Sequence, residues 1–95
     1  MFTVYIDDVF NLYDTDCRRK HGEYQTYEEA VGACKKLIDD FIEDHAKNGE
    51  DELHRCHYFW GKDPWVSPEP PGKHFSSSQY FQDEATRIFG KGKQP

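Results

Sequence analysis

Cysteine and histidine side chains in this sequence could together bind a metal ion. Cys17 and His21 have a C-x3-H spacing, and Cys56 and His57 are adjacent in a second segment that also contains His54. Thiolate and imidazole are the ligands that zinc prefers, and four of them from two segments can complete a tetrahedron. The paired C-x2-C and H-x3-H spacings are absent. A zinc-binding or metal-dependent protein that uses Cys17, His21, Cys56 and His57 is therefore the alternative hypothesis, and no other cofactor is expected.

Catalysis has weaker support in the sequence. Cys17 precedes the basic run at residues 18–20, whose charges would lower a thiol pKa, but an exposed cysteine in a polar loop is usually incidental. Cys34 falls on the apolar stripe of a predicted helix, where a free cysteine packs as a small hydrophobic residue. The motifs G-x-x-x-x-G-K-[ST], G-x-G-x-x-G, G-x-S-x-G and H-E-x-x-H do not occur. We therefore expect a non-enzymatic protein without catalytic residues.

Aromatic side chains are concentrated in residues 56–66 and could form a surface for a protein partner. A small monomer seldom leaves a wide apolar surface bare, so rings that the core does not bury would mark a contact site. The basic run at residues 18–20 could supply a polar rim. The residues expected to bind are Tyr58, Trp60, Lys62, Trp65, Arg18 and Arg19.

The composition limits the partner and the environment. The chain has 12 Lys and Arg against 18 Asp and Glu, and the formal net charge of −6 disfavours a nucleic-acid partner, since phosphates need a basic surface. No apolar run approaches the roughly 20 residues of a membrane span, so no membrane partner is expected. Three cysteines make no disulfide framework, which favours the reducing cytoplasm.

Periodicity predicts the elements in the first half of the chain. Residues 2–6 alternate like a strand with one buried face, and residues 21–25 are predicted to pair with them as an antiparallel strand. Thr26 and Glu29 form a capping box, and an apolar stripe then continues as an amphipathic helix up to Asn48. Gly32 costs about 1 kcal/mol inside a helix relative to alanine, so we expect close packing to require it.

The second half of the chain is predicted to contain less regular structure. After an acidic loop, residues 56–66 are interpreted as one or two short strands around a turn. The proline-rich residues 67–72 form an extended surface loop. Ser76 begins a second helix and has Gln79 three residues on, and Gly90 ends that helix.

These elements predict a single α+β domain over residues 1–90, followed by a frayed C-terminal tail over residues 91–95. The element order is β-β-α-β-α. The sheet is small and antiparallel, with three strands, or four if the aromatic segment contributes two. Two helices lie on one face of this sheet, because that arrangement buries both apolar stripes at once.

Several short motifs occur in a characteristic order along the chain. They are residues 5–8, residues 22–30 with the pattern G-x-[FY]-x-T-x-E-E-A, residues 60–65 and residues 75–76. In this order they resemble a family of short uncharacterised bacterial proteins, conserved hypothetical proteins without an established activity. The resemblance therefore implies no catalytic residue and no cofactor, and the segment 54–57 departs from the family pattern.

Taken together, the sequence favours function by association. We expect a small cytoplasmic module that binds an unknown protein partner, or a second copy of itself, through the aromatic residues 58–65.

Overall fold

A computed structural model describes residues 1–10 and 18–90 of the chain. Their elements, in order, are β1 (Phe2–Asp8), β2 (Arg18–Tyr24), α1 (Tyr27–His45), a 3-10 turn (Ala46–Asn48), α2 (Glu50–Trp60), β3 (Lys62–Ser67) and α3 (Ser77–Phe89). The mixed α+β class and the antiparallel sheet of three strands are confirmed. The described residues form three helices, so the prediction of two helices is wrong.

The sheet has the strand order β2-β1-β3, with β1 in the centre and antiparallel to both neighbours. Val4 in the middle of β1 lies opposite Gly22 on one side and Val66 on the other. Pro64 has no N–H to donate, and it is accommodated because β3 is an edge strand. The first two strands were expected at these places, but β2 begins three residues earlier than predicted.

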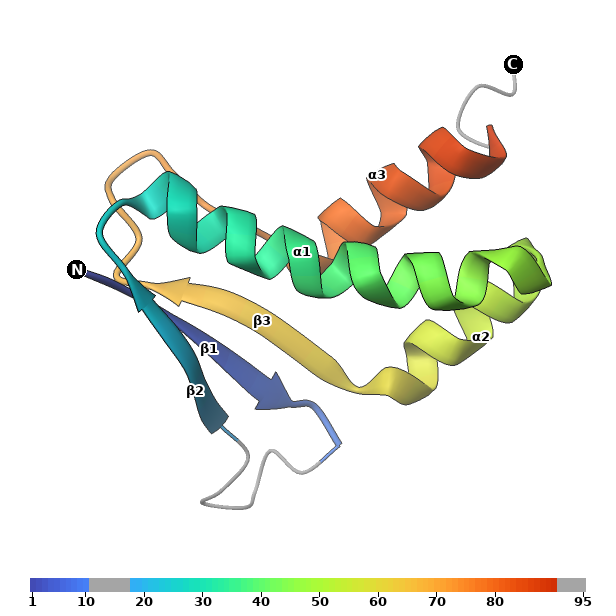
Figure 1. Cartoon of the computed structure of the whole chain (residues 1–95), viewed down its shortest axis with the longest axis horizontal. Helices are drawn as coiled ribbons and strands as arrows, with labels where there is room; N and C mark the ends of the chain where they lie inside the picture. The colour runs from blue at the N-terminus through green and yellow to red at the C-terminus, as the bar shows by residue number, and fades with distance from the viewer. Residues whose placement is uncertain (11–17, 91–95) are drawn as a thin grey trace.

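Helices α1 and α3 pack on the sheet, whereas α2 lies beyond the beginning of β3, as Figure 1 shows. Helix α1 runs along the sheet, and α2 and α3 pack beside its second half. The most deeply buried side chains lie where these elements meet: Val4, Ile38, Leu53, Val66 and Phe81 are each at most 1% exposed. Within the described ranges, no helix is long and apolar enough to cross a membrane.

The predicted helix ends at Thr26, Ser76 and Gly90 are confirmed, whereas α1 ends at His45, and the 3-10 turn occupies the residues up to the predicted end at Asn48. The Thr26 hydroxyl accepts the backbone N–H of Glu29 at 3.1 Å, and the Glu29 carboxylate accepts the N–H of Thr26 at 3.2 Å. This reciprocal pair satisfies two N–H groups that the first turn of α1 leaves free. At the start of α3, the Ser76 hydroxyl accepts the N–H of Gln79. Gly90 ends α3 in the left-handed conformation.

Helix α2 is the main correction to the predicted fold. The chain is helical up to Trp60, and β3 begins only at Lys62, so the predicted acidic loop and the strand before the turn are wrong. Three carboxylates at residues 50–52 lie in the first turn of α2, where they stabilise its free N–H groups. Leu53, His57 and Trp60 then recur at helical spacing and face the other helices.

The reason predicted for Gly32 is not found in the structure. It lies in the interior of α1 on an exposed face, and a methyl group added there would meet no atom within 4 Å. Close packing against Gly32 was expected, and that expectation is wrong. The described residues give the helix no packing reason for a glycine at this position.

Candidate functional site

The aromatic residues expected to form one surface are divided between two. Tyr58 lies in the last turn of α2, beside the end of β1, whereas Trp65 lies in β3 against Tyr5 of β1. Trp65 alternates along β3 with the buried Pro64 and Val66, so its ring is on the face of the sheet opposite the helices. The two surfaces are described separately below.

The first surface, here called the end cluster, consists of Val9, Phe10, Tyr58 and Phe59. Their exposed fractions are 43%, 55%, 69% and 64%, respectively. The ring centroids of Phe10 and Tyr58 are 6.2 Å apart, and those of Tyr58 and Phe59 are 5.2 Å apart, with each pair edge to face. These distances make the cluster a contiguous apolar surface rather than scattered exposed rings.

The turn at Gly61 holds the two halves of the end cluster together. Gly61 ends α2 with a φ of 65°, in the left-handed region that favours glycine. Its carbonyl accepts the N–H of Val9 at 2.8 Å, which joins the end of β1 to the end of α2. The Phe10 ring lies over Gly61, and the Asp8 carboxylate accepts the N–H of Phe10 at 3.0 Å. Hydrogen bonds from the backbone of Val9 and Phe10 therefore fix this half of the cluster beside the end of α2.

The second surface, the sheet-face cluster, consists of Tyr5, Asp7, Arg18 and Trp65. The Arg18 guanidinium lies 4.7 Å from the Trp65 ring centroid and 5.9 Å from that of Tyr5. It also donates two hydrogen bonds to Asp7, at 2.8 and 3.2 Å. These bonds from Arg18 are the main reason that the pKa of Asp7 is lowered. Each member of this cluster is thus engaged by another.

The Trp65 indole also faces Asp7. Its Nε1 atom is buried and makes no hydrogen bond of normal geometry within the described residues. It nevertheless contributes, after Arg18, to holding the pKa of Asp7 down. Trp65 is only partly exposed, so it offers less open surface than the end cluster.

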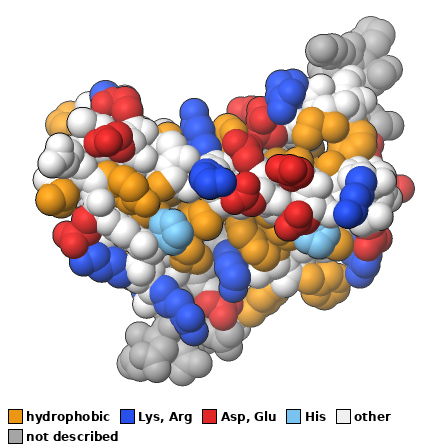
Figure 2. Space-filling view, viewed as in Figure 1, with side chains coloured by type: hydrophobic (Ala, Val, Ile, Leu, Met, Phe, Trp, Pro, Cys, Tyr) orange, Lys and Arg blue, Asp and Glu red, His pale blue; other side chains and the backbone are white. Residues whose placement is uncertain are grey.

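The remaining residues of the predicted surface lie apart from one another. Trp60 stacks on Phe41 of α1 with ring centroids 4.7 Å apart, and it packs against the core. Arg19 and Lys62 are exposed at the beginnings of β2 and β3. Lys and Arg side chains gather over the beginning of β2 in Figure 2. Of the six predicted residues, only Tyr58 belongs to the end cluster, while Arg18 and Trp65 meet in the sheet-face cluster.

The metal hypothesis receives no support from the described geometry. His21 is exposed on β2, whereas Cys56 and His57 lie on α2. Among residues 1–10 and 18–90, no three histidine, cysteine or carboxylate side chains converge in a way that could hold a metal ion. Cys17, the fourth proposed ligand, lies outside the described residues.

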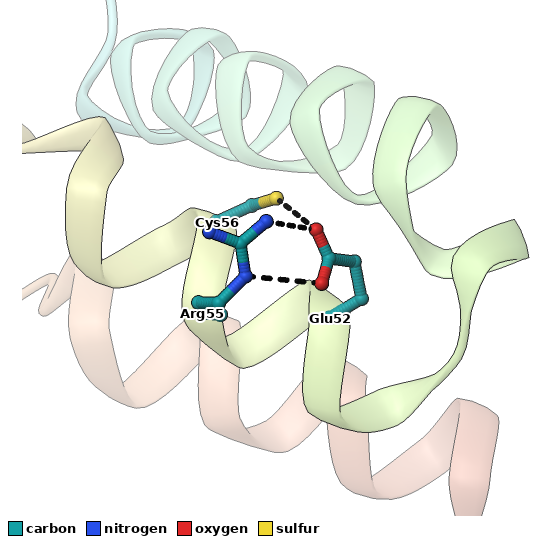
Figure 3. A network of polar contacts seen from close by, with 3 residues as sticks. All are labelled: Glu52, Arg55 and Cys56. Carbon is teal, nitrogen blue, oxygen red and sulfur yellow. Dashed lines mark hydrogen bonds and ion pairs between the residues drawn. The ribbon is translucent and has the colours of Figure 1, made fainter.

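Cys56 is instead part of a polar network on α2, drawn in Figure 3. The Glu52 carboxylate accepts two hydrogen bonds from the Arg55 guanidinium, and the Cys56 thiol donates to the same carboxylate at 3.5 Å. Loss of solvent and the adjacent Glu52 raise the pKa of Cys56. A thiol held in this way is mostly protonated, and so it is a poor nucleophile and a poor metal ligand.

A cavity of about 430 Å³ adjoins the end cluster. Val9 and Tyr58 belong both to the cluster and to the cavity lining. The polar part of the lining includes His57, Lys62, Asp63 and Ser77. Asp63 accepts a hydrogen bond from the Ser77 hydroxyl at 2.5 Å, so this carboxylate already has a partner from α3. The apolar surface therefore continues into a partly polar hollow.

Comparison with known proteins identifies no family for this chain. No protein-family model, no curated protein and no solved structure matches the chain. The resemblance carried by residues 22–30 and the other short motifs therefore stays a prediction.

Proposed function

We propose that this protein is an association module that acts by binding, through the end cluster, rather than by catalysis. The observation that carries the proposal is the grouping of three large aromatic side chains, Phe10, Tyr58 and Phe59, each more than half exposed, at one end of the molecule. Aromatic residues are enriched where protein surfaces meet, because each ring removes a large area from water at a small entropic cost.

The partner that we propose is a second copy of the chain. The four side chains of the end cluster are uncharged, so two copies can meet there without like charges facing each other within the cluster. Much of the negative charge is carried elsewhere, on the outer face of α1, by Glu28, Glu29, Asp39, Asp40, Glu43 and Asp44. A two-fold contact would place the same cluster on both sides and cover all the exposed rings at once.

The sheet-face cluster supports a structural role better than a binding role. Its guanidinium is neutralised by Asp7 and covers the faces of Tyr5 and Trp65. A partner would have to displace Arg18 to reach these rings. The end cluster has no such cover among the described residues, which is why it is preferred.

The proposal places the protein in the cytoplasm, because Cys34 and Cys56 are free thiols. The metal alternative is tested by the same first experiment as the association. Native mass spectrometry of untreated protein would show a dimer if the end cluster associates. It would show a mass excess of one zinc ion, lost on denaturation, if the metal hypothesis holds instead.

The decisive experiment compares sedimentation of the wild type with that of the double variant Tyr58→Ser, Phe59→Ser. We expect the wild type to dimerise as its concentration rises from micromolar to millimolar, and the double variant to stay monomeric. Both side chains are exposed, so the unfolding temperature should change little. Ile88→Ser is the matched control, since Ile88 is an exposed apolar residue on α3. A wild type that stays monomeric over the whole range would overturn the proposal.

A further inference from the structure

Two histidines of α2 pack on one buried ring of α3. The imidazole of His57 is stacked on Phe81 with ring centroids 3.7 Å apart and an interplanar angle of 8°. His54, one turn earlier, meets the same ring edge-on at 5.5 Å. Phe81 has no solvent-exposed surface, so both imidazoles are on the inner side of α2. The contact between the two helices thus depends on imidazole rings acting as apolar groups.

The charge state of His57 is set by its surroundings. Burial is the main cause that lowers its pKa, and the positive charge of a protonated His54 is the second. The titratable groups nearest to it come from four places. His54 lies one turn earlier on α2; Lys62, Asp63 and His74 line the same cavity as His57; and His45 of α1 meets the Phe41 ring that His57 also meets. Asp63 is the one acidic group among these five, and its carboxylate accepts a hydrogen bond from the Ser77 hydroxyl; burial and His54 outweigh it, so the pKa of His57 is lowered. His74 is engaged with Glu69.

The position of His57 connects this contact to the end cluster. Tyr58 and Phe59 follow it directly in the last turn of α2. Gly61, whose carbonyl accepts the N–H of Val9, comes two residues after Phe59. His57 also lies against the aromatic side chains of Phe41 and Trp60, each 6.0 Å away by ring centroids. The position of His57 against Phe81 therefore determines where the exposed rings of Tyr58 and Phe59 lie.

We infer that protonation of His57 is an acid switch that loosens the end of α2 from Phe81 and weakens association through the end cluster. The inference rests on the proposed function. A neutral imidazole can remain stacked between apolar rings, whereas an imidazolium ion gains free energy by reaching water. Acid therefore favours conformations in which the last turns of α2 have left Phe81. Those conformations no longer hold Tyr58 and Phe59 beside Phe10.

The test is the dimer dissociation constant at about pH 7.5 and about pH 5.5, on either side of the ordinary histidine pKa of about 6.5. We expect the constant to rise about tenfold or more in acid, since dissociation is coupled to proton uptake. His57→Phe keeps a stacked ring without the titration, so its constant should change much less. His21→Gln is the matched control, since His21 is exposed on β2, and it should behave like the wild type.

A second measurement separates failure of the switch from failure of the association. Hydrogen exchange of the α2 amides reports the position of α2 in the monomeric variant Tyr58→Ser, Phe59→Ser. Lower protection of the α2 amides at the lower pH, measured relative to the intrinsic exchange rate at each pH and abolished by His57→Phe, supports the switch even if no dimer forms. Unchanged protection of these amides, or a dimer equally stable at both pH values, would overturn it.

Discussion

The ring of Phe10 occupies the space that a side chain on Gly61 would need. A Cβ built on Gly61 would lie 2.3 Å from Phe10, and the φ of 65° already disfavours any other residue there. One glycine thus serves two purposes: it ends α2, and it lets the end of β1 lie against that end. The end cluster forms because Gly61 both ends α2 and leaves room for the ring of Phe10.

Gly61→Ala should therefore destabilise the protein. The left-handed conformation alone costs an alanine about 1–2 kcal/mol, and displacement of Phe10 adds to that cost. Chemical denaturation would measure the loss. Gly90→Ala is the matched comparison, because Gly90 ends α3 in the same left-handed conformation, with a φ of 72°, but an added Cβ there would meet nothing within 4 Å. If the two variants were equally stable, the contact with Phe10 would be unimportant.

Gly32→Ala should have the opposite effect. The added methyl group meets no atom within 4 Å, while alanine favours a helix interior over glycine by about 1 kcal/mol. We expect a higher unfolding temperature by differential scanning calorimetry and an unchanged circular dichroism spectrum. A destabilised variant would mean that something other than the described residues lies against this face of α1.

Trp60→Ala should cost substantial stability, because the ring stacks on Phe41 and packs against the core. Complete burial would give roughly 3–5 kcal/mol, and the partial exposure of Trp60 brings our expectation to about 2–3 kcal/mol. Urea denaturation would measure the change, with Tyr58→Ala as a control for an exposed ring in the same turn of α2. A Trp60→Ala variant as stable as the wild type would show that this ring is not a core residue.

The ion pair of Asp7 and Arg18 should make a small contribution that depends on pH. The folded state lowers the pKa of Asp7 below its ordinary 3.8. The contribution is therefore present above that value and is lost as the pH falls through the lowered pKa. Arg18→Gln should cost at most about 1 kcal/mol near neutral pH, because the Arg18 side chain is half exposed. The part of the difference that comes from the ion pair should be lost in acid, as stability curves at several pH values would reveal, while the part from the contacts of Arg18 with Trp65 and Tyr5 should remain.

Cys34 should be unreactive in the folded protein. Its side chain is fully buried, and desolvation raises its pKa to about 12, with a smaller effect from Asp63. Alkylation by iodoacetamide, followed by peptide mass spectrometry, should label Cys34 only after unfolding. Cys56 should react slowly, because its thiol is bound to Glu52. Rapid labelling of Cys34 in the native protein would contradict its buried position.

The sequence predicted the parts of the fold that local signals determine. Helix α1 was found because Thr26 and Glu29 cap it and an apolar stripe follows, and the start of α3 was found at Ser76 for the same reason. Helix α2 was missed because the aromatic run at residues 58–60 favours a strand by composition. Its inner face includes His57, a residue type that is not counted as apolar, so the helical period was hidden.

The candidate site was only partly predictable. Tyr58 was expected to bind, but Val9 and Phe10 were not singled out, although an apolar pair beside the acidic residues 7–8 was a signal that could have found them. Their contact with α2 joins segments about fifty residues apart through the left-handed turn at Gly61. No spacing along the chain predicts such a contact. The pairing of Arg18 with Trp65 likewise depends on β1 lying between β2 and β3.

The two edge strands of the sheet, β2 and β3, affect whether association can continue beyond a dimer. The exposed residues 18–21 at the start of β2 are consecutive basic side chains and a histidine, and β3 contains a proline that offers no N–H. Charged side chains and proline discourage strand-to-strand addition, the route by which sheets grow into fibres. The pairing that we propose through the end cluster would then stop at closed dimers, because neither edge strand invites further strands.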